Sequence, residues 1–252
     1  MRARVIPVLL VEEGSLVKTI KFNKRVYLGD PINTVRLFND MEVDELLVLD
    51  ISATRNSSGP NYSLIEEIRN EAFMPLGYGG GIKNSQETKN LINMGIEKVV
   101  INSACFSAEP IIEETSSLIG SQSVVASLDI KKTAFGQYKV YSYLTEKILD
   151  LKLNDFLEEL AYKGVGEIFL NNVHKDGTWM GYDLEIIKRV SDLIKVPIVA
   201  CGGSGSLDNI KQVIEAGASA AAAGSLFSFQ GKGMGVLTNY PDPETLDNLF
   251  NE

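Results

Sequence analysis

Eight short apolar runs recur along the chain, and each is followed by a turn and an amphipathic stretch. The runs are continuously apolar and do not alternate with polar residues, which is typical of strands covered on both faces. The predicted strands are Arg4–Leu10, Glu45–Asp50, Pro75–Gly79, Lys98–Asn102, Val124–Asp129, Glu167–Asn171, Pro197–Cys201 and Ala220–Ala223.

Helical patterns separate the strands. Asp30 and Pro31 provide an N-cap and a proline at the first helical position, and glycines 95, 164 and 217 provide C-terminal stops. The predicted helices are Ile32–Met41, Asn61–Asn70, Ser85–Met94, Pro110–Ile119, Asn154–Lys163, Asp183–Ile194, Leu207–Ala216 and Glu244–Phe250. Strands that alternate with helices in this way predict an α/β fold, and eight such units predict a (β/α)8 TIM barrel.

The chain repeats itself. Gly80-Gly81 and Gly202-Gly203 are 122 positions apart (202 − 80 and 203 − 81), and each pair follows a short apolar strand. The same spacing, without a gap, relates Val43 to Val165, Glu45 to Glu167, Gly59 to Gly181, Lys89 to Lys211, Gly95 to Gly217 and Ser103 to Ser225. We therefore expect one barrel domain over residues 1–252 with half-barrels at approximately 1–122 and 123–252. A doubly wound sheet is the alternative, but it would not predict the gapless repeat.

Composition and charge exclude several classes of partner. The chain is 44% hydrophobic with a net charge of −9 and no cluster of basic residues, so we expect neither a nucleic acid nor a membrane as partner. Cys105 and Cys201 lack the spacing of a metal site or a disulfide framework, so we predict no metal and no cofactor and expect a cytoplasmic location. The N-terminal stretch 1–7 is too short for the apolar region of a signal sequence, and no apolar run approaches the ~18 residues of a membrane span.

Residues that follow the strands of a barrel meet at one mouth, where such folds place their chemistry. Successive glycines there expose backbone N–H groups that suit phosphate. The strand ends predict two equivalent cradles on opposite sides of the mouth, formed by Gly80, Gly81, Asn102 and Ser103 and by Gly202, Gly203, Gly224 and Ser225. A ligand with a phosphate at each end would fit them. Ordinary turn chemistry is the alternative.

Carboxylates also lie at the mouth. Asp50 and Asp129 end strands and Asp176 lies in a loop, so all three are candidate acids and bases in a partly desolvated site. An N-cap or a hydrogen bond to a loop amide is the alternative role for each. His174, the single histidine, is expected to be incidental, and Cys201 is expected to be a small apolar filler.

Several of these motifs resemble one family. Leu49-Asp50-Ile51, Gly79-Gly80-Gly81-Ile82, Ile101-Asn102-Ser103-Ala104, Asp176-Gly177-Thr178 and Gly202-Gly203 resemble the HisF family, the cyclase subunit of imidazole glycerol phosphate synthase. The resemblance covers about residues 3–228. It implies a half-repeated barrel that receives ammonia from a glutaminase subunit on its N-terminal face and uses it on a diphosphorylated substrate at the C-terminal mouth.

The resemblance also implies roles for individual residues. Gly81, Asn102 and Ser103 would hold one phosphate, Gly177, Gly203, Gly224 and Ser225 the other, Lys18 would close over the substrate, Asp50 and Asp176 would belong to the substrate site, and Arg4, Glu45, Lys98 and Glu167 would ring the ammonia entrance. The four ring residues begin strands, two of each charge sign. Charges at a barrel base are costly to bury unless they are paired, so we expect a mutually satisfied ring.

One departure from the family is chemical. The family uses two catalytic aspartates, of which the second is Asp129, whereas the first falls at Leu10. A leucine transfers no proton, and the loss of one member of an acid–base pair typically costs ~10²–10⁴ in rate. This disfavours synthesis of imidazole glycerol phosphate.

Three functions follow from the sequence. Asn171 and Asn172, a reshaped first loop and the tail at 235–241 look like the HisF-like paralogues of bacterial surface-glycan clusters. Those proteins work with a HisH-like glutaminase and an ATP-dependent amidotransferase to amidate a sugar. The alternatives are an authentic cyclase of histidine biosynthesis and a non-enzymatic barrel that only conducts ammonia between two partners. The sequence favours the first.

Overall fold

The barrel predicted from the apolar runs is present and closed. The computed structural model describes residues 2–107 and 109–251. Its barrel strands are β1 (Arg4–Glu12), β4 (Leu46–Asp50), β5 (Leu76–Gly79), β6 (Lys98–Ile101), β7 (Val124–Lys132), β10 (Glu167–Asn172), β11 (Ile198–Cys201) and β12 (Ala220–Ala223). Neighbouring strands pair in parallel, and pairing of β10 with β7 closes the circle. The prediction of a (β/α)8 barrel is confirmed.

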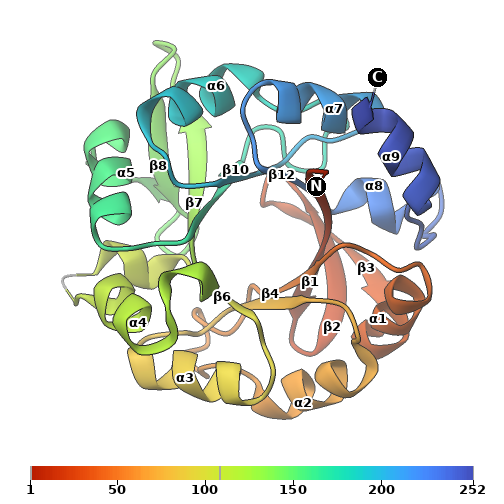
Figure 1. The fold of residues 1–252 in the computed structure, drawn as a ribbon, viewed down its shortest axis with the longest axis horizontal. Coiled ribbons are helices and arrows are strands. Elements are labelled where there is room, and N and C mark those ends of the chain that lie inside the picture. The colour runs from red at the N-terminus through yellow and green to blue at the C-terminus, as the bar shows by residue number, and fades with distance from the viewer. Residues whose placement is uncertain (1, 108, 252) are drawn as a thin grey trace.

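Helices form a ring around the strands (Figure 1). They are α1 (Pro31–Asp40), α2 (Tyr62–Glu71), α3 (Ser85–Asn93), α4 (Ile111–Ile119), α5 (Leu153–Tyr162), α6 (Leu184–Leu193), α7 (Leu207–Glu215), α8 (Ser225–Ser228) and α9 (Pro243–Asn251), with 3₁₀ turns η1 (Ser103–Phe106) and η2 (Ser121–Ser123). Asp30 caps α1 as predicted, because its side chain accepts a hydrogen bond of 2.8 Å from the Asn33 N–H. Helix α8 is a single turn that the sequence did not predict. Within residues 2–107 and 109–251, no helix combines the length and the apolar character needed to cross a membrane.

Two apolar layers explain why the strands read as continuous apolar runs. Along β1, Val5 and Leu9 belong to the layer between strands and helices, whereas Ile6 and Val8 belong to the layer inside the barrel. Phe169 of β10 is buried in the inner layer. Both faces of each strand are thus covered, so polar residues gather at the strand ends.

Two strands run further than the sequence indicated. β1 continues to Glu12 and pairs with β2 (Ser15–Ile20), which pairs with β3 (Lys24–Gly29). β7 continues to Lys132 and pairs with β8 (Tyr138–Ser142), which pairs with β9 (Lys147–Ile148). The predicted strand ends at Leu10 and Asp129 were therefore wrong. β2 and β8 run antiparallel to the extensions of β1 and β7. They satisfy the backbone N–H and C=O groups of these extensions, which would otherwise leave the barrel without partners.

Each of these extensions crosses the mouth to a loop on another strand. In the β2–β3 hairpin, the Lys21 N–H donates a hydrogen bond of 3.0 Å to the Asp176 carbonyl, beyond β10. From β8, the Tyr143 hydroxyl donates a hydrogen bond of 3.1 Å to the Ile51 carbonyl, beyond β4. The hairpins approach each other at Phe22 and Tyr141, whose ring centroids are 6.4 Å apart. They form the side walls of the candidate site.

Candidate functional site at the barrel mouth

A cavity of about 320 Å³ opens at the C-terminal ends of the barrel strands. All the residues predicted for the substrate site line it, namely Lys18, Asp50, Gly81, Asn102, Ser103, Asp129, Asp176, Gly177, Gly203, Gly224 and Ser225. The structure therefore brings together side chains from both halves of the chain. Within the described residues, some of these groups already have hydrogen-bond or packing partners in the protein, whereas others do not.

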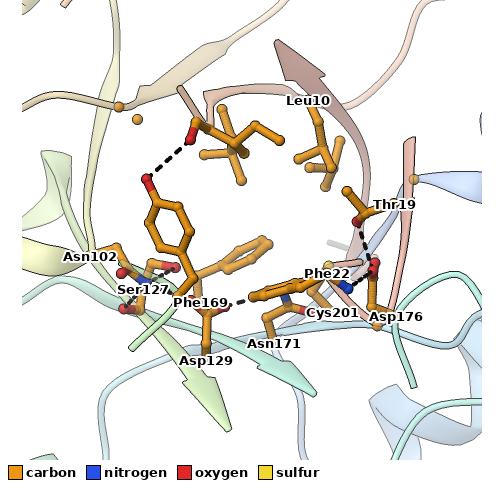
Figure 2. Close-up of a pocket in the computed structure, with 18 of the residues that line it drawn as sticks. Leu10, Thr19, Phe22, Asn102, Ser127, Asp129, Phe169, Asn171, Asp176 and Cys201 are labelled. Carbon is orange, nitrogen blue, oxygen red and sulfur yellow. Dashed lines mark hydrogen bonds between the residues drawn. The ribbon is translucent and has the colours of Figure 1, made fainter. Parts of the chain in front are cut away.

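Asp129 is the central polar group of one wall. Its side chain is 5% exposed, and each carboxylate oxygen accepts a hydrogen bond from an asparagine. The Asn102 Nδ2 lies 3.0 Å from Oδ2 and the Asn171 Nδ2 lies 3.3 Å from Oδ1 (Figure 2). Burial raises the pKa of Asp129 to about 7, although the two hydrogen bonds act in the opposite direction. The carboxyl can therefore both accept and return a proton near neutral pH.

The opposite wall is aliphatic. Figure 2 shows Leu10 across the opening from Asp129. Leu10 pairs in register with Leu49 of β4, just as Asp129 pairs in register with Asn171 of β10. Both pairs line the same cavity. One wall thus carries a carboxyl held by amides, and the other carries two leucines.

Lys18 reaches into the mouth from β2. Its ammonium is buried, donates a hydrogen bond to the Val8 carbonyl and lies directly against the backbone of Gly224, where a Cβ atom would collide with Nζ. Burial lowers the pKa of Lys18 to about 8, partly offset by Asp176. The absence of a side chain at Gly224 thus leaves room for a cation beside a predicted phosphate cradle.

Asp50 and Asp176 already accept hydrogen bonds from loops. The Asp50 Oδ1 accepts bonds of 2.9 Å from the Ser52 N–H and 3.0 Å from the Ala53 N–H. The Asp176 Oδ2 accepts bonds of 2.7 Å from the Thr19 hydroxyl and 3.2 Å from the Phe22 N–H. Burial raises the pKa of Asp176, although these bonds oppose the shift. The geometry matches the alternative role of hydrogen bonding to loop amides, and a contact with substrate stays a prediction for both.

Two of the predicted cradle glycines are required by loop packing. Gly81, at φ +72°, lies against Gly59, and a Cβ on Gly81 would be 2.7 Å from the Gly59 carbonyl oxygen. Gly203, at φ +106°, makes the same kind of contact with Gly181, whose N–H donates a 2.8 Å hydrogen bond to the Gly203 carbonyl. The two contacts are 122 positions apart (181 − 59 and 203 − 81). Turn chemistry therefore accounts for these glycines without a ligand, and phosphate binding stays a prediction.

The four charges at the barrel base form a closed set of ion pairs. Arg4 contacts both Glu45 and Glu167. The Lys98 Nζ lies 3.1 Å from a Glu45 oxygen and 2.8 Å from a Glu167 oxygen. Above the ring lies a cavity of about 10 Å³, and Val100 and Phe169 line both this cavity and the mouth. Val100 and Phe169 therefore separate the small cavity above the ring from the larger cavity at the mouth.

Sequence reasoning missed several residues of the site. It noted Asn171 only as a departure from the family. It expected the stretches 18–29 and 131–147 on the mouth face but gave no role to Phe22, Lys131 or Tyr141, although all line the cavity. The Lys131 Nζ lies 3.5 Å from the centroid of the Tyr141 ring, a cation–π contact. One available signal was that Asn171 and Asp129 end consecutive predicted strands, which pair in a barrel. Cys201 lines the cavity as a filler would, since burial raises the pKa of its thiol to about 12.

Across residues 2–107 and 109–251, no three His, Cys, Asp or Glu side chains converge to hold a metal ion.

By its architecture, with polar groups gathered at the C-terminal ends of the strands, the protein belongs to the class of (β/α)8 barrels. The profile of a family described as "Histidine biosynthesis protein" matches residues 4–233. A provisionally named imidazole glycerol phosphate synthase subunit HisF from Leptospira borgpetersenii is 45% identical over 252 residues, covering 99% of each chain.

Other relatives carry similar names. A provisionally named subunit hisF2 from Pseudomonas aeruginosa is 44% identical over 98% of this chain and 99% of its own. The imidazole glycerol phosphate synthase subunit HisF of Exiguobacterium sibiricum is 35% identical over 98% of this chain and 95% of its own. The chain therefore belongs to the HisF family.

Proposed function

We propose that this chain is the ammonia-accepting synthase subunit of a glutamine amidotransferase complex. A HisH-like glutaminase docks on the N-terminal face and releases ammonia at the floor of the barrel. The ammonia passes to the mouth, where it joins a phosphorylated acceptor. The acceptor is a sugar of surface-glycan biosynthesis, and an ATP-dependent sugar amidotransferase is the third partner.

The arrangement of the barrel base supports a route for ammonia. Arg4, Glu45, Lys98 and Glu167 satisfy one another, so they form a stable floor and do not attract a further ion. The cavity above them, of about 10 Å³, is close to the size of one small molecule. Its walls are otherwise apolar, which favours neutral ammonia over ammonium.

The mouth supports a phosphorylated acceptor. Lys18 contributes a buried ammonium next to Gly224, and Ser225 and Gly203 line the same side of the cavity. An anionic group seated there would raise the pKa of Lys18 back toward its ordinary value and would form a charge-assisted hydrogen bond. The protein's net charge of −9 makes such a local cation necessary for holding an anion.

The observation that carries the proposal is the pairing of Leu10 with Leu49 opposite Asp129. The family's cyclase uses two catalytic aspartates, whereas this mouth has Asp129 on one side and Leu10 at the position of the other aspartate. The authentic cyclase is the second candidate, because relatives named imidazole glycerol phosphate synthase subunit HisF are 35% and 36% identical.

Turnover of the family's diphosphorylated cyclase substrate separates the two candidates. We expect the purified chain, supplied with ammonium, to form imidazole glycerol phosphate at least ~10²-fold more slowly than an authentic cyclase, since one acid–base group is missing. A Leu10→Asp variant tests whether that group is the cause and should recover part of the rate. Parent turnover at the rate of an authentic cyclase would contradict the glycan proposal and favour the cyclase.

The ammonia route has a separate test in the complex with a HisH-like glutaminase. Lys98→Ala opens the ring and should let ammonia escape, so that glutamine is hydrolysed without a matching amount of aminated product. Lys163→Ala removes a cation that directly follows α5 and pairs with Glu159, and it serves as the control. Equal coupling in both variants would contradict a route through the floor.

A further inference from the structure

Asp129 is held from both sides by its neighbouring strands. Asn171 is its register partner on β10, and Asn102 directly follows β6, the strand on the other side of β7. Each amide takes a different carboxylate oxygen, at 3.3 Å from Asn171 and 3.0 Å from Asn102. Two donors from opposite directions fix the plane of the carboxyl group, because rotation about the side chain would break both hydrogen bonds.

This arrangement leaves the oxygen atoms of both amides without hydrogen bonds within the described part of the chain. Among the described residues, the Oδ1 atoms of Asn102 and Asn171 are buried and have no hydrogen-bond partner. An unpaired buried carbonyl is unfavourable, so packing alone does not explain the orientation of these side chains. Asn102 also donates to the Ser127 carbonyl at 3.0 Å, whereas within residues 2–107 and 109–251 the Asn171 amide donates only to Asp129. The carboxylate is therefore what orients the Asn171 amide.

Several other groups of the mouth already have partners or are apolar. Lys18, whose pKa burial lowers to about 8, donates to the Val8 carbonyl. Leu10 and Leu49 occupy the opposite wall. Asp50 and Asp176 are engaged with loop amides and hydroxyls. The titratable groups that interact electrostatically with Asp129 are Lys131 on its own strand, Tyr141 and Tyr143 on or after β8, Cys201 on β11 and Asp176 beyond β10.

We propose that Asn171 is a positioning residue: together with Asn102, it holds the Asp129 carboxylate in the single orientation in which it takes a proton from ammonia at the mouth. This inference rests on the proposed function. The lone pair of the ammonia nitrogen forms a bond to the electrophilic carbon of the acceptor, and the bond from that carbon to the departing group breaks, its electron pair leaving with that group. The nitrogen then carries a positive charge. One N–H bond then breaks, its electron pair stays on nitrogen, and the proton forms an O–H bond with Asp129. The proton later leaves Asp129 for the departing group of the acceptor or for water, which restores the carboxylate.

Asn171 acts on this step by favouring the ionised carboxyl. An N–H that donates to a carboxylate lowers the pKa of that group, which counters the effect of burial. With a side chain that has no donor at position 171, one of the two hydrogen bonds that lower the pKa of Asp129 would be lost, and the increase caused by burial would be larger. The carboxyl would then hold its proton to higher pH, and a smaller fraction would act as a base at neutral pH.

The experiment is an NMR titration of the full chain labelled with ¹³C at the aspartate carboxyls. The Asp129 signal is identified by its loss in Asp129→Asn. It should titrate near pH 7 in the parent protein. In Asn171→Leu it should titrate about one pH unit higher, which is a tenfold tighter hold on the proton. Asn171→Ser, which keeps a short donor, should fall between the two and provides a second variant if the leucine variant does not fold.

The neighbouring Asn172 is the matched control. Its amide is also buried but donates to Asp183 at 2.8 Å, so Asn172→Ser should leave the Asp129 titration in place. The proposal is overturned if Asn171→Leu and Asn171→Ser both titrate within about 0.2 units of the parent, or if Asn172→Ser causes the same shift. The titration requires neither glutaminase nor acceptor. A failure of the proposed function would therefore appear in the coupling assays, and a failure of this inference would appear here.

Discussion

Asp129 links the stability of the protein to pH, because folding buries its carboxyl group. Burial raises the pKa from an ordinary 3.8 to about 7, whereas the unfolded chain keeps the ordinary value. Over the range between these two values, the folded protein holds a proton that the unfolded chain has lost. The free energy of unfolding therefore falls as pH rises through this range and levels off above it.

Asp129→Asn removes this linkage and keeps a similar shape. We expect the variant to be more stable than the parent at about pH 8, by on the order of 3 kcal/mol, and to lose this advantage near about pH 4. Urea denaturation of both proteins at the two pH values measures the difference. A stability difference that does not change between them would show that the carboxyl is not protonated by burial.

At the scale of elements, contacts with loops beyond β10 and β4 tie the two hairpins that cross the mouth. Asp176 accepts hydrogen bonds from Thr19 and Phe22 of the β2–β3 hairpin. Arg55 donates to the Tyr143 carbonyl at 3.2 Å and pairs with Glu146 at 3.1 Å, both beyond β8. These ties are local, so breaking one should loosen one hairpin without loosening the barrel.

Hydrogen exchange of backbone amides tests this independence. Asp176→Ala should speed exchange over residues 15–29, and Arg55→Ala should speed it over 138–148, by roughly tenfold for each 1.4 kcal/mol of lost local stability. Each variant serves as the other's control, and the amides of β10 and β11 should keep the parent rate in both. Faster exchange throughout the protein would mean that the ties hold the barrel together and not the hairpins.

The hairpins also show where sequence reasoning reached its limit. The barrel strands and most helices were predictable, because burial on both faces leaves continuous apolar runs and capping residues such as Asp30 mark the helix starts. β2 was not predictable in this way. It contains Lys18 and Thr19, whose polar side chains are buried by contacts with β1 and with Asp176, far away in the sequence. A propensity pattern does not record such tertiary contacts.

The candidate site also contains residues that the sequence predicted and residues that only the tertiary structure reveals. Asp129 and the cradle residues were correctly expected at the mouth, because their residue types and their positions after strands carry a chemical meaning. Asn171 has no such signature alone, and its importance comes from its register with Asp129. Likewise, Gly81 signalled a phosphate in the sequence, but the structure places its backbone against Gly59. Spacing thus located the mouth, and only the packing showed which of its groups already have partners within the fold.

At the scale of the whole molecule, closure of the barrel brings four charges from four strands into one ring. The side chains of Glu45, Lys98 and Glu167 are 7%, 18% and 12% exposed, so water screens their interactions only in part. Each carboxylate contacts both Arg4 and Lys98. Removing one member therefore leaves partly buried charge without full compensation, and this costs more than the loss of a surface ion pair.

Lys98→Met retains the length of the side chain and removes its charge, so it should lower the free energy of unfolding by about 2–4 kcal/mol. Lys163→Met is the control, because Lys163, directly after α5, pairs with Glu159 at 2.6 Å and the two side chains are 29% and 50% exposed. Its loss should cost only about 0.5 kcal/mol or less. Adding Glu45→Gln to Lys98→Met removes one of the stranded carboxylates, so the double variant should lose less stability than the sum of the two single variants. Urea denaturation of the parent and of the four variants, Glu45→Gln alone included, measures these differences. If Lys98→Met were no more destabilised than Lys163→Met, the ring would be a set of independent solvated pairs, and its four charges would need an explanation other than mutual compensation.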